Sequence, residues 1–152
     1  MTKIELKKPN GDVFLIAERA PDNAYIHAHW IGIQTLETVK QGGNLHIQML
    51  EEQPCPRLLN DHKELIGPWT VANEWIVQHW TPRVMALGLE YMAQVLAPGV
   101  YGKMSFHQLH QFIGDKFQIK MFEEVDPALA WLLTVGTSDP VRPPDQRTFP
   151  TL

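Results

Sequence analysis

Histidines are the first candidates for a functional role in this sequence, because imidazole side chains can bind metal ions. The chain has 7 of them. His27 and His29 on a strand, or His107 and His110 on a helix, would each put two imidazoles on one face. Two imidazoles supply half of a typical transition-metal site. The alternative is that these histidines are exposed or hydrogen-bonded within the protein, and we expect no metal ion and no other cofactor.

A second candidate group follows the short apolar run Arg57-Leu58-Leu59, which is typical of a buried strand. Asn60, Asp61 and His62 would then stand at the exit of that strand. Open α/β sheets usually bind ligands at such carboxyl ends, which favours a binding site here. The alternative is an ordinary cap, in which the Asp61 carboxylate accepts hydrogen bonds from the following loop or helix.

Trp69 and Thr70 complete the candidate set because they stand at the start of a predicted helix. A tryptophan at a helix start could line a pocket or anchor a partner, although most tryptophans at helical spacing belong to a core. Thr70 is the nearest hydroxyl to Asp61, and a phosphate near a helix N-terminus would be tolerated electrostatically. We predict an interaction or switch surface formed by Asn60, Asp61, His62, Trp69 and Thr70.

No set of catalytic residues is apparent in the sequence. Ser105 has a complete explanation as the first residue of a capping box, and Ser138 lies in a proline-rich tail. Cys55 is the single cysteine, so it has no partner for an internal disulfide. The glycines at 42 and 43 complete no phosphate-binding loop. We therefore expect a protein that is not an enzyme.

Length and composition limit the remaining possibilities. The chain has 152 residues, of which 44% are hydrophobic, with a net charge of −4. These values predict one folded domain over residues 1–135 and a proline-rich tail over residues 136–152. No run of Lys or Arg provides the positive surface that nucleic-acid binding requires. No apolar stretch is long enough to span a membrane and the N-terminus does not resemble a signal peptide, so we expect a cytoplasmic protein.

The elements that would position these residues alternate along the chain. A hairpin is predicted at 13–18 and 24–30, and further strands at 57–59, 89–96 and 117–121. Helices are predicted at 35–52 with a weak point at the two glycines, 68–87 with a kink at Pro82, 106–113, and 126–133. This order predicts an α/β fold with a mixed, mostly parallel sheet, an N-terminal hairpin and interleaved helices.

Several short motifs, taken in order, resemble the STAS-like (SpoIIAA-like, STAS/SEC14) small bacterial single-domain proteins. The resemblance runs from about Val13 to Leu133. It rests on Trp30-Ile31-Gly32, Leu59-Asn60-Asp61, Asn73-Glu74-Trp75, Trp80-Thr81-Pro82-Arg83, Gly88, Met104-Ser105, Phe122 and Ala130-Trp131-Leu132.

The resemblance implies a regulatory or ligand-holding module without catalytic residues. In phosphorylated members of this fold, a serine lies in an Asp-Ser-Ser/Thr-Gly motif after the central strand, but segment 60–70 lacks that motif. We therefore transfer no phosphorylation site. The leading hypothesis is a non-enzymatic protein-interaction module that binds a protein partner or a second copy of itself. The alternatives are a carrier of a small apolar, lipid-like ligand and a histidine-based metalloprotein.

Overall fold

A six-stranded mixed sheet forms the centre of the protein. The computed structural model describes residues 3–113 and 116–137. The strands lie side by side in chain order: β1 (Lys3–Lys7), β2 (Val13–Arg19), β3 (Ile26–Ile33), β4 (Arg57–Ile66), β5 (Tyr91–Val95) and β6 (Gln118–Phe122). The β1–β2 and β2–β3 pairs are antiparallel, whereas β3 to β6 are parallel. The predicted α/β fold class, with its mixed and mostly parallel sheet, is confirmed.

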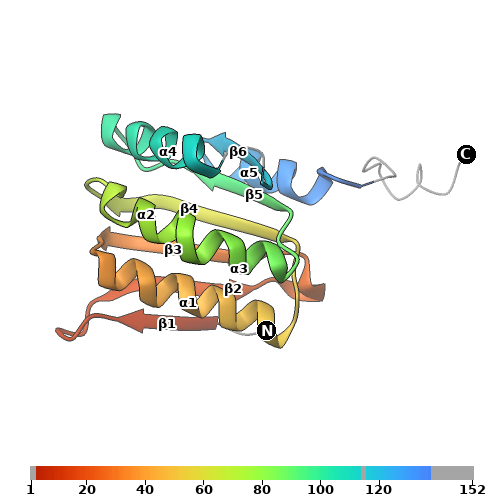
Figure 1. Ribbon diagram of the computed structural model, residues 1–152, viewed down its shortest axis with the longest axis horizontal. Helices are drawn as coiled ribbons and strands as arrows, with labels where there is room; N and C mark the ends of the chain where they lie inside the picture. Colours follow the sequence, from red (N-terminus) through yellow and green to blue (C-terminus); the bar gives the residue numbers. More distant parts are fainter. Residues whose placement is uncertain (1–2, 114–115, 138–152) are drawn as a thin grey trace, which may run out of the picture.

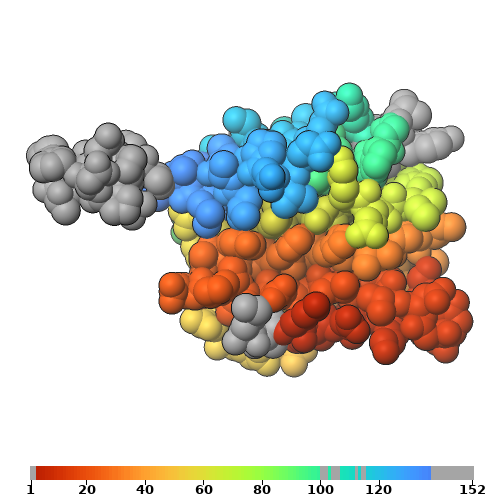
Figure 2. Space-filling model, turned by 180° about the vertical axis from the view of Figure 1, so that it is seen from behind, coloured from red at the N-terminus to blue at the C-terminus, as the bar shows by residue number. Residues whose placement is uncertain are grey.

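Helices cover the two faces of this sheet unequally (Figure 1). One face carries α1 (Leu36–Glu52), α2 (Asn73–Trp75), α3 (Thr81–Ala86) and α4 (Val100–Ile113). The other face carries α5 (Val125–Thr134), which packs against β4, β5 and β6. Figure 2 shows this second face, on which the N-terminal strands are not covered by a helix of the described chain. The larger apolar core therefore lies under α1 to α4.

The N-terminal hairpin of the prediction is the β2–β3 pair, connected through the short helix η1 (Pro21–Asn23). Strand β1, which pairs with β2 at the edge of the sheet, was not predicted. Its residues alternate between charged and apolar, so that Ile4 and Leu6 can face the core while the lysines stay exposed. The strand forms because it can complete the hydrogen bonds of β2, which is a tertiary effect.

The predicted helix 68–87 is a chain of short segments. It begins later than expected, with η2 (Thr70–Ala72), and continues through α2, the π-helical segment η3 (Ile76–Trp80) and α3. Pro82 stands in the first turn of α3, directly after the π segment. Proline has no N–H to donate, so the helical hydrogen-bond pattern changes there. Ile76 O accepts both the backbone N–H of Thr81 and, at 2.9 Å, its Oγ1 hydroxyl. The sequence predicted that Pro82 would kink or divide the helix near Trp80-Thr81, and the structure divides it there, with helical dihedral angles at both residues.

Two further boundaries correct the predictions. Helix α4 begins at Val100, so Ser105 lies inside the helix and the predicted capping box at its start is wrong. Strand β4 continues to Ile66, so Asp61 lies within the strand and not at its exit. Most of the predicted tail, including Ser138, lies outside the described residues. None of the described helices is both long and apolar enough to cross a membrane.

Candidate functional site

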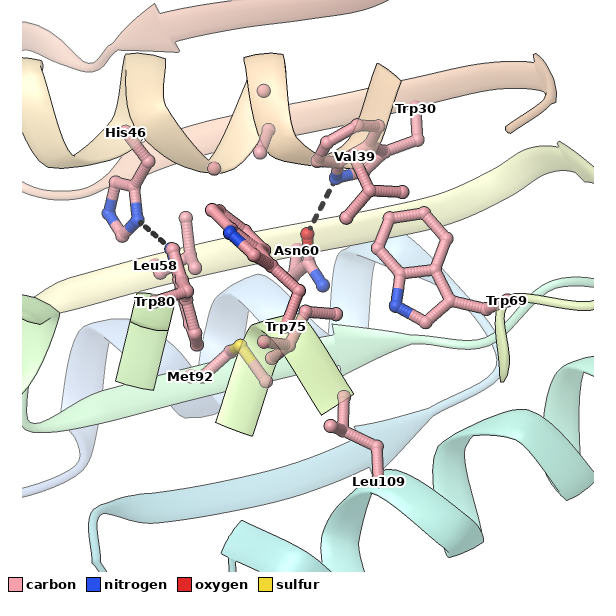
Figure 3. Close-up of a pocket in the computed structure, with 14 residues that line it drawn as sticks. Trp30, Val39, His46, Leu58, Asn60, Trp69, Trp75, Trp80, Met92 and Leu109 are labelled. Atoms are coloured by element: carbon pink, nitrogen blue, oxygen red, sulfur yellow. Dashed lines mark hydrogen bonds between the residues drawn. The ribbon is translucent and has the colours of Figure 1, made fainter. Parts of the chain in front are cut away.

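A cavity walled by four of the five tryptophans lies between the sheet and the helices α1 and α2 (Figure 3). Its volume is about 50 Å³. We call it the tryptophan cavity. It is lined by Ala28, Trp30, Val39, Gly42, Gly43, His46, Leu58, Asn60, Trp69, Trp75, Ile76, Trp80, Met92 and Leu109.

The elements place these side chains by simple geometry. Trp30 on β3 and Asn60 on β4 project to the helix-covered face because side chains alternate along a strand. Trp69 precedes η2, while Trp75 and Trp80 end α2 and the π segment. Trp69 packs edge-on against Trp30, with 4.9 Å between ring centroids. The sheet is therefore the floor of the cavity, and the segment 69–80 forms one wall with α1 opposite.

Two adjacent glycines let α1 approach the indoles. A Cβ added to Gly42 would lie 2.2 Å from Cη2 of Trp30, and one added to Gly43 would lie 2.7 Å from Cη2 and Cζ3 of Trp75. Real Cβ atoms do not approach other atoms so closely, so any larger residue would have to displace an indole. The glycines predicted as a weak point lie instead in a continuous helix. Their role is to seat two cavity tryptophans.

A chain of hydrogen bonds runs along the floor of the cavity. The Trp30 indole donates from Nε1 to Asn60 Oδ1 at 2.9 Å. Asn60 Nδ2 in turn donates to Gln94 Oε1 at 2.7 Å and lies 3.3 Å from His62 Nε2. Gln94 is 1% exposed, so this polar group is buried deep in the core. These hydrogen bonds give partners to the side-chain oxygen and nitrogen of Asn60, which would otherwise be buried without any.

Both buried histidines around the cavity are uncharged at neutral pH. Burial, reinforced by Arg19, lowers the pKa of His46 to about 3. Burial also lowers the pKa of His62 to about 3, although the charge of Asp61 opposes the shift. His46 Nδ1 accepts a hydrogen bond from Trp80 Nε1 at 3.2 Å, so the proton of this imidazole resides on Nε2. That Nε2 has no hydrogen-bond partner within the described chain.

The structure divides the residues that the sequence grouped together. Asn60, His62 and Trp69 meet on the helix-covered face, where the His62 and Trp69 rings are 4.4 Å apart. Asp61 lies between Asn60 and His62 on β4, and neighbouring residues of a strand project to opposite faces, so Asp61 projects to the other face of the sheet. Thr70 is half-buried and does not line the cavity. Only part of the predicted surface therefore belongs to one site.

Asp61 belongs to a separate polar group on the face that carries α5. Its buried carboxylate lies 3.0 Å from His27 Nε2 and accepts from the backbone N–H of Lys63 at 2.9 Å. Burial alone would raise the pKa of Asp61, but these hydrogen bonds outweigh it and hold the pKa below its ordinary value. Next to it, His29 Nε2 pairs with Glu64 at 2.7 Å.

The two histidine pairs of the metal hypothesis do not meet. His27 and His29 face carboxylates on one side of the sheet, whereas His107 and His110 are exposed on α4 on the other side. Among the described residues, no group of three or more His, Cys, Asp or Glu side chains is arranged to hold a metal ion. Cys55 is buried, and burial raises the pKa of its thiol. The described residues thus give the metalloprotein hypothesis no support.

Five residues that form or support the site were not predicted from the sequence: Trp30, Gly42, Gly43, His46 and Gln94. A signal existed for Trp30, which shares a strand face with Ala28 and so had to point at the core. His46 and Gln94 gave no such signal, because their partners Trp80 and Asn60 are 34 residues away in each case.

Comparison with known proteins adds information on the fold. No family model and no curated protein matches the chain. Among solved structures, it is similar to an uncharacterised protein of the DUF3478 family with a SpoIIAA-like fold, from Shewanella loihica PV-4. The two chains are 23% identical over 78% of this chain and 91% of the other, with a TM-score of 0.48. A SpoIIAA-like fold is what the sequence resemblance implied. Similarity of this extent concerns the fold and says nothing about function.

Proposed function

We propose that this protein is a non-enzymatic module that holds a small, mainly apolar ligand in the tryptophan cavity. The observation that carries the proposal is a space bounded by four indoles within the larger apolar core. Protein interiors approach the packing density of organic crystals and contain few spaces larger than a water molecule. A space with aromatic walls is therefore not expected from packing alone. Concave, mostly aromatic surfaces with a few polar groups are typical of small-molecule sites.

Helix α1, which forms one wall, contains two glycines that destabilise the helix but make room for the cavity tryptophans, and this supports the proposal. Two consecutive glycines inside α1 each cost the helix roughly 1 kcal/mol relative to alanine. They allow Trp30 and Trp75 to lie against the helix backbone. The opposite wall contains a π-helical segment, a feature that is frequent at functional sites. Both irregularities adjoin the cavity.

The size of the cavity limits what it can hold without rearrangement. Its volume of about 50 Å³ is small, since a benzene-binding cavity in another protein measures roughly 150 Å³. Trp30, Trp69 and Trp80 are buried, whereas Trp75 is half-buried and adjoins solvent. A ligand with more than a few atoms therefore requires Trp75 to move, and this side chain has room to do so.

Tryptophan fluorescence tests the proposal, because four of the five fluorophores surround the site. Titration with toluene should give a saturable change. Ala28→Leu, which extends a side chain into the cavity, should abolish that change. Ala17→Leu is the matched control: Ala17 is also buried but does not line the cavity, so this variant should keep the response. Thermal melts must show that both variants fold. A response that is absent in the wild type, or that survives in Ala28→Leu, would contradict the proposal.

A second candidate function, binding to another copy of the same chain, is favoured by a patch at the carboxyl end of β3 and β4. Ile33 and Ile66 are register partners there, and each is 60% exposed. Leu36 at the start of α1 and Val71 in η2 are also exposed, and these two elements pack together. We call these four residues the end patch.

Charges of both signs flank the end patch, which suits a two-fold dimer. Lys8 donates from Nζ to Ile33 O at 2.9 Å, and Glu37 is exposed one residue beyond Leu36. A surface with both signs can pair with its own copy. Light scattering over a concentration series should show dimers that Ile66→Glu disrupts and Met121→Glu, at another exposed apolar position, does not. A monomer at every concentration would contradict this candidate.

A further inference from the structure

The described lining of the tryptophan cavity carries no formal charge. Of its fourteen residues, His46 is the only one with a titratable side chain, and that imidazole is neutral at pH 7. A carboxylate or phosphate drawn into the cavity would lose its hydration without gaining an opposite charge. Burying an unpaired charge is strongly unfavourable. The part of the ligand inside the cavity must therefore be uncharged.

The hydrogen-bond donors of the lining are mostly occupied by the protein. The N–H of Trp30 goes to Asn60, that of Trp80 goes to His46, and the amide of Asn60 goes to Gln94. A ligand that took one of these donors would have to break an existing buried bond, which gains little. These groups hold the walls in place and are not available to a ligand.

Trp75 differs from these residues, because its indole N–H makes no hydrogen bond within the described chain, although its ring stacks on His79. Figure 3 shows the Trp75 indole projecting into the middle of the lining residues. Its six-membered ring is the part seated over Gly43. The described lining thus offers two donors without a partner in the described chain, the Trp75 indole N–H and the buried Nε2–H of His46. Of these two, Trp75 lies on a half-buried side chain that can adjust to a ligand.

Building on the function proposed above, we propose that the ligand is an uncharged, mainly apolar molecule whose hydrogen-bond acceptor, such as a carbonyl oxygen, takes the indole N–H of Trp75. Indole N–H groups donate but do not accept, so a molecule with an acceptor is preferred over one of equal size without it. A carboxylate would also accept this hydrogen bond, but the lining has no positive charge to pair with it, so the ionised form of a fatty acid is rejected as the buried group.

Three probes of matched size separate these possibilities: methyl butanoate, which is neutral with a carbonyl; pentanoate, its anionic counterpart; and toluene, which has no carbonyl. The readout is the indole N–H region of a ¹H–¹⁵N correlation spectrum, in which each of the five tryptophans gives one signal. The signal missing from Trp75→Phe identifies Trp75. Trp75→Phe keeps an aromatic ring in place but removes the donor.

Methyl butanoate should bind saturably and move the Trp75 signal downfield more than any other indole signal. Pentanoate should bind at least about tenfold more weakly. Trp75→Phe should weaken methyl butanoate by roughly fivefold, as expected for one hydrogen bond, and leave toluene unchanged. The proposed ligand class would be overturned if the ester and the anion bound equally, or if the ester bound without moving the Trp75 signal. Toluene binding in the same experiment would still support the cavity as a binding site. If no probe, toluene included, shifts any indole signal, the proposed function itself is overturned.

Discussion

The indole of Trp30 occupies the space in which Gly42 would carry a side chain, since a Cβ built on this glycine would lie 2.2 Å from Trp30 Cη2. Trp30 is 5% exposed and its N–H is bonded to Asn60, so the ring cannot move away easily. This contact joins α1 to β3 and sets the distance between the helix and the floor of the cavity. The position of one glycine thus determines whether the cavity exists in its present form.

Gly42→Ala should lower the free energy of unfolding by about 1–3 kcal/mol, because the overlap with Trp30 outweighs the better helix propensity of alanine. Gly43→Ala is the matched comparison. It presses on the half-buried Trp75, which can shift, and should cost less. Urea unfolding of both variants measures the difference. If Gly42→Ala were as stable as the wild type, Trp30 would not be fixed as described.

The hydrogen-bonded pair Asn60 and Gln94 should show strong coupling. Asn60→Leu leaves the Trp30 N–H and the Gln94 amide oxygen without their partners, and we expect a loss of roughly 2–4 kcal/mol. In the double variant with Gln94→Leu, one of these buried polar groups is removed. The loss should therefore be smaller than the sum of the two single losses, by about 1 kcal/mol or more. Additive losses in a double-mutant cycle would show that the two side chains do not interact.

The two buried histidines should make the protein sensitive to mild acid. In the unfolded chain they titrate near the ordinary value of about 6.5, whereas in the fold their pKa is about 3. The unfolded state thus binds more protons between these values, and stability is lost as the pH falls below about 6.5. Each histidine should account for roughly 2 kcal/mol between pH 7 and pH 5.

Denaturant unfolding at several pH values checks this expectation, with His62→Gln as the test variant. Removing one of the two groups should about halve the pH dependence between pH 7 and pH 5. His107→Gln, at an exposed position on α4, should leave it unchanged. A stability that does not vary over this range would mean that His46 and His62 are not buried in the neutral form.

Much of the fold could be predicted from local patterns, because the strands show period-two or short apolar runs and the helices show apolar stripes. The site could be predicted only in part. Asn60 and Trp69 were identified from their place on a strand and at a helix start. Asp61 was assigned to the same site because the end of β4 was placed too early, and a strand sends neighbouring residues to opposite faces. The seating of Trp75 on Gly43 joins residues 32 positions apart, and no local pattern indicates such a contact.

Arg57 should hold α5 against the sheet through two hydrogen bonds to the end of that helix. Its Nε donates to Leu132 O at 2.8 Å and its Nη2 donates to Val135 O at 2.7 Å. Lysine cannot reproduce this fork, so Arg57→Lys should lower the free energy of unfolding by about 1–2 kcal/mol. Arg83→Lys changes an exposed ion pair with Glu51 and should have an effect close to zero. Equal effects of the two substitutions in thermal unfolding would contradict the role given to Arg57.

Native mass spectrometry of the untagged protein from the cells that produce it tests most directly whether the tryptophan cavity holds a small molecule. We expect a mass above that of the chain by a constant amount, which is lost on denaturation and absent from Ala28→Leu. The extra mass should extract into organic solvent as an uncharged compound. A mass equal to that of the bare chain in monomer or dimer, with no small molecule in the extract, would contradict the claim.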